Sequence, residues 1–235
     1  MSSVPAGYNE RLFAGRGLRS WLHNARFHWF RGVVDRLSIR GERVLEIGCF
    51  DAKLIDWLPG KPVHYVGVDA NWEKGLDLAR RRYAGDPGVV LIEAASPDFA
   101  AVDAGGFDLG VSMETLEHVP PEQVAGYLDR LANDVAGYLV ITVPNEKGPV
   151  FAAKWLAKKL LYRDAEHYSL AEFANALLGR MARVGRNQHK GFDYADLIEQ
   201  VQARCDVLLV EAIPFRRLPL ALAFGVGIVA RTRRA

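Results

Sequence analysis

The sequence predicts an α/β fold in which a mostly parallel sheet carries helices on both faces. Two observations lead to this prediction. From residue 43 to residue 144, short apolar runs alternate with amphipathic stretches, which is the pattern of consecutive strand–helix–strand units. Several predicted strands also end on small or acidic residues, as expected where a parallel sheet presents a binding edge. The length of 235 residues suits one domain with a sizeable core.

The first predicted elements are helical and precede the sheet. Apolar and aromatic residues recur at roughly helical spacing over residues 11–37, which predicts one or two helices in an N-terminal cap, residues 1–40. In the main domain, residues 41–235, residues 148–187 contain two helical stretches without a strand and are expected to form a helical lid insertion over the sheet edge. Strands are predicted at 43–47, 63–68, 88–93, 107–112, 137–143, 206–213 and 224–231, and helices at 51–58, 72–83, 121–132 and 193–203.

The segment around Gly48 is the strongest functional signal in the chain. Residues 44–47 form an apolar strand that breaks at Gly48, and a second apolar run ends in Asp69, 21 residues further on. This is the arrangement of a Rossmann-like unit that binds a nucleoside. A glycine turn lets backbone N–H groups approach the ligand, and an acid at the tip of the second strand can accept hydrogen bonds from both ribose hydroxyls. We therefore expect a nucleoside site at this edge of the sheet.

The residues of this turn indicate which nucleoside is bound. A dinucleotide site has glycines at the first, third and sixth positions, so that a pyrophosphate can reach the helix N-terminus. Counted from Gly48, the third and sixth positions are Phe50 and Lys53, which argues against NAD or FAD. Glu46 and Asp51 flank the glycine instead, and carboxylates favour a cationic ligand over a phosphate. S-Adenosylmethionine, which carries a sulfonium and an ammonium group but no phosphate, meets this requirement.

Four segments, in the expected order, resemble the motifs of one enzyme family. Residues 46–52 read EIGCFDA, residues 107–120 read FDLGVSMETLEHVP, residues 138–146 read YLVITVPNE and residues 188–201 read QHKGFDYADLIEQV. Together they resemble class I S-adenosylmethionine-dependent methyltransferases, in the branch that includes the ubiquinone-biosynthesis O-methyltransferases. The first segment has phenylalanine and alanine where that family usually has its later glycines. The resemblance implies a Rossmann-like seven-stranded, mostly parallel sheet with an antiparallel last strand.

The resemblance also implies how the cofactor would be held. Glu46 would face the methionine ammonium, Asp69 would bind the ribose hydroxyls, and Glu114 with the two residues before it would pass under the sulfonium. The backbone of the first turn would line the methionine and the ribose. The complete expected set of cofactor-binding residues is Glu46, Gly48, Cys49, Phe50, Asp51, Asp69, Ala70, Asn71, Ala94, Ala95, Ser112, Met113 and Glu114.

Three histidines are candidates for a catalytic base. Methyl transfer from a sulfonium mainly needs alignment of the reactants, but a hydroxyl acceptor also needs a group that takes its proton. His118 lies in the LEHV segment, and His167 and His189 lie in or beside the lid insertion. A structural role is the alternative for His118. In part of the quinone branch such residues bind a divalent cation, which would make Glu114, Glu117 and His118 ligands here, but no metal is assigned.

Charge is unevenly distributed along the chain, although the net charge is only +2. Residues 1–40 carry +5, residues 41–144 carry −9 and residues 145–190 carry +5. The acidic block coincides with the predicted cofactor half, and the near-neutral total without a basic-aromatic motif argues against a nucleic-acid partner. Cys49 and Cys205 offer no disulfide framework, and no apolar run has the length of a membrane span. A cytoplasmic location is therefore expected.

Residues 151–163, FAAKWLAKKLLYR, predict a basic amphipathic helix. It either packs as a lid or inserts shallowly into an anionic membrane, at the inner membrane face, which would suit a lipid-linked acceptor. The sequence thus predicts methyl transfer, chiefly to oxygen, on a small or lipid-linked molecule such as a quinol, a saccharide or a glycolipid intermediate. The alternative is a non-catalytic protein of the same fold that binds a partner, because Phe50 and Ala52 alter the glycine turn.

Overall fold

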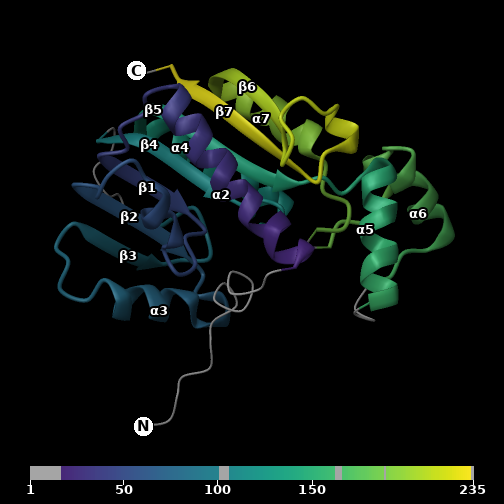
Figure 1. Ribbon diagram of the computed structural model, residues 1–235, viewed down its shortest axis with the longest axis horizontal. Helices are drawn as coiled ribbons and strands as arrows, with labels where there is room; N and C mark the ends of the chain where they lie inside the picture. The colour runs from purple at the N-terminus through teal and green to yellow at the C-terminus, as the bar shows by residue number, and fades with distance from the viewer. Residues whose placement is uncertain (1–16, 101–105, 162–165, 188, 234–235) are drawn as a thin grey trace, which may run out of the picture.

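The computed structural model describes residues 17–100, 106–161, 166–187 and 189–233, and these residues contain a seven-stranded sheet (Figure 1). The strands are β1 (Arg43–Ile47), β2 (His64–Asp69), β3 (Val89–Glu93), β4 (Phe107–Met113), β5 (Val135–Pro144), β6 (Cys205–Ile213) and β7 (Gly225–Thr232). Their order in the sheet is β3, β2, β1, β4, β5, β7, β6. Strands β1 to β5 pair in parallel, whereas β7 is antiparallel to both β5 and β6. The predicted α/β, Rossmann-like class with an antiparallel last strand is confirmed.

Helices cover both faces of the sheet (Figure 1). The α-helices are α2 (Leu18–Arg36), α3 (Gly75–Arg82), α4 (Pro121–Asp134), α5 (Gly148–Leu161), α6 (Leu170–Leu177) and α7 (Tyr194–Arg204). Short 3-10 helices are η1 (Lys53–Trp57), η2 (Trp72–Lys74), η3 (Met181–Arg183) and η4 (Leu220–Leu222). The predicted N-terminal helix is present as α2, and residues 11–16 of that prediction lie outside the described residues.

Two predicted helices differ from the structure in length and type. Residues 51–58 contain only η1, and residues 72–83 divide into η2 and α3. The backbone turns to positive φ at Phe50 and Ala52 before η1, and at three of residues 71–74 before α3. An α-helix cannot continue through residues with left-handed φ. These turns follow β1 and β2, so they reshape the chain at the edge where the nucleoside site is expected.

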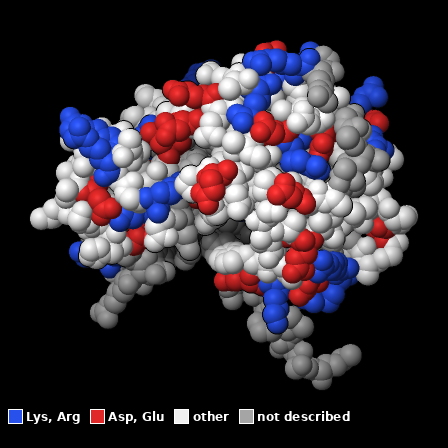
Figure 2. All heavy atoms as spheres, turned by 180° about the vertical axis from the view of Figure 1, so that it is seen from behind, with Lys and Arg blue, Asp and Glu red and all other residues white. Residues whose placement is uncertain are grey.

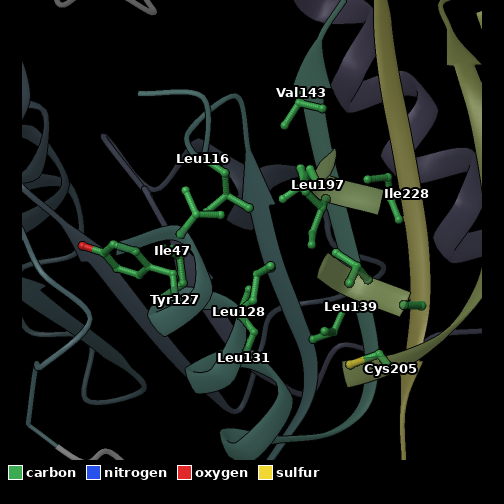
Figure 3. Close-up of a cluster of buried hydrophobic side chains, with 14 of the residues drawn as sticks. Ile47, Leu116, Tyr127, Leu128, Leu131, Leu139, Val143, Leu197, Cys205 and Ile228 are labelled. Atoms are coloured by element: carbon green, nitrogen blue, oxygen red, sulfur yellow. The ribbon is translucent and has the colours of Figure 1, made fainter. Parts of the chain in front are cut away.

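Apolar side chains on the two faces of the sheet form two buried cores. One lies against α4 and α7, where Leu128, Leu131 and Leu197 pack on side chains of β5 and β7 (Figure 3). The other lies beneath α2, whose Phe30 and Val33 have no exposed surface. Each fully buried side chain of this size contributes about 1.5–3 kcal/mol to stability. The two cores fix the positions of the strand ends, and therefore of the loops that follow them.

Helices α5 and α6 stand beyond the carboxyl ends of the parallel strands, at the right of Figure 1. They correspond to the two helical stretches predicted within residues 148–187. A small apolar cluster, made of Phe151, Ala176, Met181 and Val184, holds the two helices together. This segment therefore has a core of its own, next to the edge of the sheet.

The start of α6 makes the stability of this segment depend on pH. Ser169 and Glu172 form a capping box, and the Glu172 carboxylate also accepts a hydrogen bond from the Gly185 N–H (3.2 Å) and pairs with Lys190 (2.8 Å). The hydrogen bond from Lys190, followed by those from the backbone, lowers the pKa of Glu172 to about 2. The corresponding pKa in an unfolded chain is ~4.3. The stabilisation is therefore complete above pH ~4.3 and is lost as the pH falls towards 2.

We expect a Glu172→Gln variant to have a lower Tm than the wild type at pH 7, and the difference to shrink as the pH falls from about 5 to about 3. Calorimetric scans at matched ionic strength measure both proteins. Glu199→Gln, at an exposed position of α7, is the control and should differ little from the wild type at any pH. A Tm difference for Glu172→Gln that does not change with pH would contradict the ion-pair assignment.

Candidate active site

Gly48 turns the chain at the end of β1 in a conformation that requires glycine. Its φ is +76°, and a Cβ atom there would lie 2.1 Å from the hydroxyl oxygen of Thr115. The N–H groups of Gly48 and Cys49 both donate to the Val68 carbonyl oxygen, at 2.7 and 3.2 Å. These two N–H groups therefore join β1 to β2 and are not free to bind a ligand. The glycine instead lets the segment after β4 come close to the turn.

We expect Gly48→Ala to lower both the stability and the affinity for the expected cofactor. The added methyl group overlaps Thr115 and forces alanine into positive φ, which together cost about 2 kcal/mol or more of unfolding free energy. Urea denaturation and cofactor titration measure the two effects. Gly85→Ala is the matched control, because Gly85 also has a positive φ (+82°) but a Cβ atom there meets nothing within 4 Å. Equal losses in both variants would show that the backbone conformation alone requires glycine.

Asp69 ends β2 and organises the turns on both sides of it. One carboxylate oxygen accepts a hydrogen bond from the Phe50 N–H at 3.0 Å, and the other accepts one from the Asn71 N–H at 2.7 Å. Burial raises the pKa of Asp69, and the backbone hydrogen bonds oppose that rise. A carboxylate offers more acceptor sites than these two N–H groups use, so Asp69 keeps capacity for a ligand hydroxyl beside its backbone donors. The acid at the strand tip is thus held in a defined orientation.

Phe50 and Trp72 form an aromatic pair beside Asp69. Their ring centroids are 6.0 Å apart, and Trp72 is exposed. The Phe50 ring lies against Gly75, where a Cβ atom would approach it to 2.3 Å, so the side chain points to the start of α3. The Ala94 N–H donates to the Asp69 carbonyl oxygen at 2.9 Å, which brings the end of β3 to the same edge. The other expected residues of this edge are half-buried or exposed: Asp51, Ala70, Asn71 and Ala95.

Glu46 is a buried acid at the penultimate position of β1. Only 4% of its surface is exposed, and the Tyr65 hydroxyl donates a hydrogen bond to its carboxyl group. Burial raises the pKa of Glu46 well above its usual range, although the bond from Tyr65 opposes this. A neighbouring cation would stabilise the ionised form, as expected for an ammonium site. Sequence reasoning missed Tyr65, although the parallel register of Glu46 with Gly67 places Tyr65 on the same face of the sheet.

The end of β4 brings Ser112, Met113 and Glu114 to the same edge. Ser112 is fully buried with its hydroxyl oxygen unpaired among the described residues, and Met113 is buried. Glu114 has a positive φ of 52°, and its N–H donates to the Thr142 carbonyl oxygen at 2.8 Å. Burial raises the pKa of Glu114. Strands β1, β2 and β4 therefore present their expected residues on one continuous edge.

Next to this edge, the structure gathers a group that sequence reasoning assembled only in part: Glu117, His118 and His189. Glu117 has no exposed surface, and neither of its carboxylate oxygens has a hydrogen-bond partner among the described residues. His118 Nε2 and His189 Nδ1 lie 3.8 and 4.0 Å from Glu117 Oε1. The two imidazole rings meet edge to face, with centroids 4.2 Å apart. His167, the third predicted histidine, is exposed and does not belong to this group.

The chemistry of this group suits a divalent cation. The three possible ligand atoms lie within 4.8 Å of one another. Burial lowers the pKa of both histidines, that of His189 to about 3 with help from His118, so both rings are neutral at pH 7 and can ligate. A bound cation would also offset the cost of burying the Glu117 carboxylate without a partner. The sequence suggested Glu114, Glu117 and His118 as possible metal ligands. In the structure, His189 and not Glu114 lies with Glu117 and His118.

A buried ion pair closes the site on the side of α5. Lys154 Nζ lies 2.6 Å from Glu146 Oε1 and donates to the Asn145 carbonyl oxygen at 3.0 Å. Its side chain is only 14% exposed, so Lys154 faces Glu146, whereas Lys158 and Lys159 on the same helix are exposed. Arg186 donates to the Glu117 carbonyl oxygen at 2.8 Å. Sequence reasoning assigned no role to Glu146 or Arg186, although both lie in segments that carry the family resemblance or adjoin them.

One face of the molecule is rich in acidic side chains (Figure 2). Figure 2 shows acidic side chains gathered around a hollow on one face of the molecule, with most Lys and Arg side chains towards its margins. Such a negative region attracts a cationic ligand and repels phosphate.

Comparisons with known proteins agree with this geometry. Residues 18–185 match the family described as methyltransferase domain. The ubiquinone biosynthesis O-methyltransferase of Thiobacillus denitrificans is 33% identical over 65% of this chain and 67% of its own, and that of Paracidovorax citrulli is 29% identical over 71% and 73%. In fold, the N-methyltransferase NodS from Bradyrhizobium japonicum, solved with S-adenosyl-L-homocysteine, has a TM-score of 0.59 at 13% identity, covering 96% of each chain. The chain therefore belongs to the S-adenosylmethionine-dependent methyltransferases.

Proposed function

We propose that this enzyme transfers the methyl group of S-adenosylmethionine to an oxygen atom of a small or lipid-linked acceptor, such as a quinol, a saccharide or a glycolipid intermediate. The observation that carries the proposal is the Glu117/His118/His189 group beside the cofactor edge, which supplies neutral imidazoles where a hydroxyl has to lose its proton. The names of the relatives in Thiobacillus denitrificans and Paracidovorax citrulli, both O-methyltransferases, support the choice of oxygen.

In this proposal the cofactor lies along the ends of β1, β2 and β4. Asp69 accepts hydrogen bonds from the ribose hydroxyls with the acceptor capacity that its backbone donors leave free. Glu46 accepts the methionine ammonium, whose charge favours the ionised carboxylate in its buried place. The exposed Trp72 and the neighbouring Phe50 offer an aromatic surface for the adenine. These contacts hold the sulfonium at a fixed distance from the acceptor, which is the main source of rate acceleration in a direct displacement.

The acceptor hydroxyl is proposed to lie against His118 and His189. As its oxygen forms the bond to the methyl carbon, the carbon–sulfur bond breaks, its electron pair stays on sulfur, and the hydroxyl proton passes to an imidazole nitrogen. The lowered histidine pKa values keep that nitrogen unprotonated before the reaction. As the alternative to this base role, Glu117, His118 and His189 would hold a divalent cation through the same nitrogens; the cation would lower the pKa of a hydroxyl that it contacts, and the proton would pass to solvent instead of to an imidazole.

A panel of acceptors tests the proposal. Purified protein with S-adenosylmethionine is offered a catechol or quinol, a phenol-bearing isoprenoid, a saccharide and, as matched controls, the corresponding amines. We expect mass spectrometry to find the added methyl group on the hydroxyl compounds and not on the amines. Methylation of the amines alone would replace the proposal with N-methylation. Cofactor binding without turnover on any class would favour the non-catalytic alternative, for which the comparisons give no support.

We also propose that α5 brings the enzyme to an anionic membrane surface. Leu156 and Leu160 are exposed, the latter to 71%, and Lys158 and Lys159 lie beside them in the last turns of the helix. In the described residues no helix is long and apolar enough to cross a membrane. Contact would therefore be peripheral, by shallow insertion of the two leucines between lipid head groups. A cytoplasmic location at the inner membrane face remains an expectation of this proposal.

We expect Lys158→Glu/Lys159→Glu to bind vesicles that contain anionic lipid at least ~10-fold more weakly than the wild type, since each cation near such a surface contributes ~1 kcal/mol. Co-sedimentation with anionic and zwitterionic vesicles measures the binding. Arg40→Glu/Arg81→Glu, a double reversal at exposed positions outside α5, is the matched control and should lose much less. Equal losses in both variants would show that binding depends on total charge and not on α5.

A further inference from the structure

A groove separate from the cofactor edge runs along α2. One wall is a stripe of the helix, formed by Trp21, Ala25, His28, Trp29, Gly32 and Arg36, and the other is the segment from Pro214 to Arg217 after β6. Its volume is about 690 Å³. Helix α2 crosses the face of the sheet next to β6 and β7 (Figure 1), so the groove follows this corner of the molecule. The stripe spans 16 residues, from Trp21 to Arg36, and is about 22 Å long.

Small residues keep the groove open, and aromatic residues line one end of it. A Cβ atom on Gly32 would meet no atom within 4 Å, which shows free space above the middle of the helix. At the other end of the stripe, Trp21 and Phe215 meet with ring centroids 5.8 Å apart, and both are substantially exposed, at 46% and 58%. Large apolar side chains left open to solvent beside an empty channel indicate a surface that an apolar ligand covers.

The charges along the groove are positive. Arg216 and Arg217 are exposed and form no ion pair with any other residue that the structure describes. The nearby carboxylate of Glu211 already has two partners. Its Oε2 atom lies 2.8 Å from the Arg36 guanidinium and 2.8 Å from the indole nitrogen of Trp29, which donates a hydrogen bond to it. The unpaired arginines therefore complement an anionic group, while the wall beneath them complements a hydrocarbon.

The groove opens at the same edge of the sheet as the methyl-transfer site. Pro144, which ends β5, and Ile213, which ends β6, are both register partners of Gly225 on β7. Two strand spacings separate β5 from β6, so these strand ends are about 10 Å apart. The segment from Pro214 follows Ile213 directly, and Glu146 follows Pro144 after one residue. A ligand in the groove thus has its aromatic end close to the acceptor side of the active site.

We propose that this groove binds the hydrocarbon chain of a single-chain anionic amphiphile, with its anionic group at Arg216 and Arg217. The chain lies over Gly32 and Ala25, and its anionic end lies beside the Trp21–Phe215 pair. For a lipid-linked acceptor, the same groove holds the apolar chain while the hydroxyl-bearing head lies at His118 and His189. Only this last assignment rests on the proposed function.

Quenching of tryptophan fluorescence by 12-bromododecanoate, used below its micellar concentration, tests the groove directly. Bromine quenches at contact, and Trp21 and Trp29 line the groove. We expect saturable quenching by this probe, at least 10-fold weaker binding of 4-bromobutyrate, which has the charge without the chain, and weaker binding of 12-bromododecanol, which has the chain without the charge. With the carboxylate at Arg216 and Arg217, beside the Trp21–Phe215 pair, the bromine at the other end of the chain lies near Trp29, so loss of most of the quenching in Trp29→Phe would assign the signal to the groove.

Two variants separate the chain from the charge. Gly32→Leu fills the free space and replaces glycine by a better helix former, so the protein should remain folded but bind the probe at least 10-fold more weakly. Arg216→Gln/Arg217→Gln should weaken binding at least 5-fold, whereas Arg40→Gln/Arg81→Gln, the matched control, should leave it unchanged. S-Adenosylmethionine titration should give the same affinity in all of these proteins.

Several results would overturn the proposal. Unchanged probe binding in Gly32→Leu would place the probe elsewhere, and quenching by vesicle-bound but not by monomeric bromolipid would make this face a membrane contact. Self-association that Gly32→Leu or Trp21→Phe abolishes would make it an interface between two copies of the chain.

If the acceptor panel shows O-methylation while the probe does not bind, the groove assignment alone fails. If the probe binds the groove but hydroxyl acceptors are not methylated, the proposed function fails and the groove stands.

Discussion

An Asp69→Ala variant is expected to bind S-adenosylmethionine at least ~100-fold more weakly than the wild type. Two hydrogen bonds from the ribose hydroxyls to a charged carboxylate contribute ~1.5–3 kcal/mol each, and every 1.4 kcal/mol changes the affinity tenfold. The same substitution removes the acceptor for the Phe50 and Asn71 N–H groups, so both turns of the site lose a fixed point. Calorimetric titration with S-adenosylmethionine and S-adenosylhomocysteine measures the loss for both ligands.

Two further variants test whether the loss of S-adenosylmethionine affinity comes from the Asp69 carboxylate. Asp69→Asn keeps the shape and one oxygen acceptor, so it should retain more affinity than Asp69→Ala while remaining well below the wild type. Asp206→Ala, which removes an exposed carboxylate of β6 that pairs with Arg233, is the matched control and should bind both ligands normally. Wild-type affinity in a folded Asp69→Ala protein would remove Asp69 from the cofactor site and reduce it to a strand-end turn acid.

The second large effect is expected at Glu117. Glu117→Gln should reduce methyl transfer at least ~100-fold, because a neutral amide neither attracts a divalent cation nor stabilises an imidazolium formed at His118 or His189. Its Tm in metal-free buffer should be no lower than that of the wild type. The Glu117 carboxyl group is fully buried with both oxygens unpaired in the described structure, so a neutral group of the same shape removes a desolvation cost without breaking a hydrogen bond.

Metal titration separates the two roles of Glu117. In the wild type, Mn²⁺ or Zn²⁺ should raise Tm and a chelator should reverse the change, whereas Glu117→Gln and His189→Ala should show little response. Glu122→Gln, an exposed position in the first turn of α4, is the matched control and should respond as the wild type does. Full activity in the presence of a chelator, together with no Tm response to either ion, would leave the histidines as bases and remove the cation.

The sequence predicted the sheet well because the signals for strands and for the turns between them are local. Apolar runs bounded by glycines, prolines and acids identified all seven strands to within a few residues at each end. The importance of Gly48 and Asp69 could also be predicted, because a parallel unit that binds a nucleoside at its strand ends needs a tight turn after the first strand and an acid at the end of the second. The helices after β1 and β2 were less predictable, since positive φ at Phe50 and Ala52 depends on contacts of that turn with other segments.

Tertiary structure alone decided which distant residues meet. His189 joins His118 and Glu117 only because the loop before α7 folds back over the end of β4, and nothing in the spacing of these residues along the chain requires it. Lys154 lies on the side of α5 that faces Glu146, and a helical pattern cannot show which polar face another segment covers. The groove along α2 likewise depends on where the chain passes after β6.

The sequence by itself therefore determined the α/β class, the positions of the strands along the chain and the preference for a cationic cofactor, and it predicted the sheet edge at which that cofactor binds. Periodicity and turn chemistry act over a few residues, so one sequence suffices to identify them. Only the tertiary structure decided that His118 and His189 meet at Glu117, which residue pairs with Lys154, and that the N–H groups of Gly48 and Cys49 bind the Val68 carbonyl oxygen. These features are set by packing between elements far apart in the chain, where burial removes water and leaves each polar group to the partners that the fold brings near it.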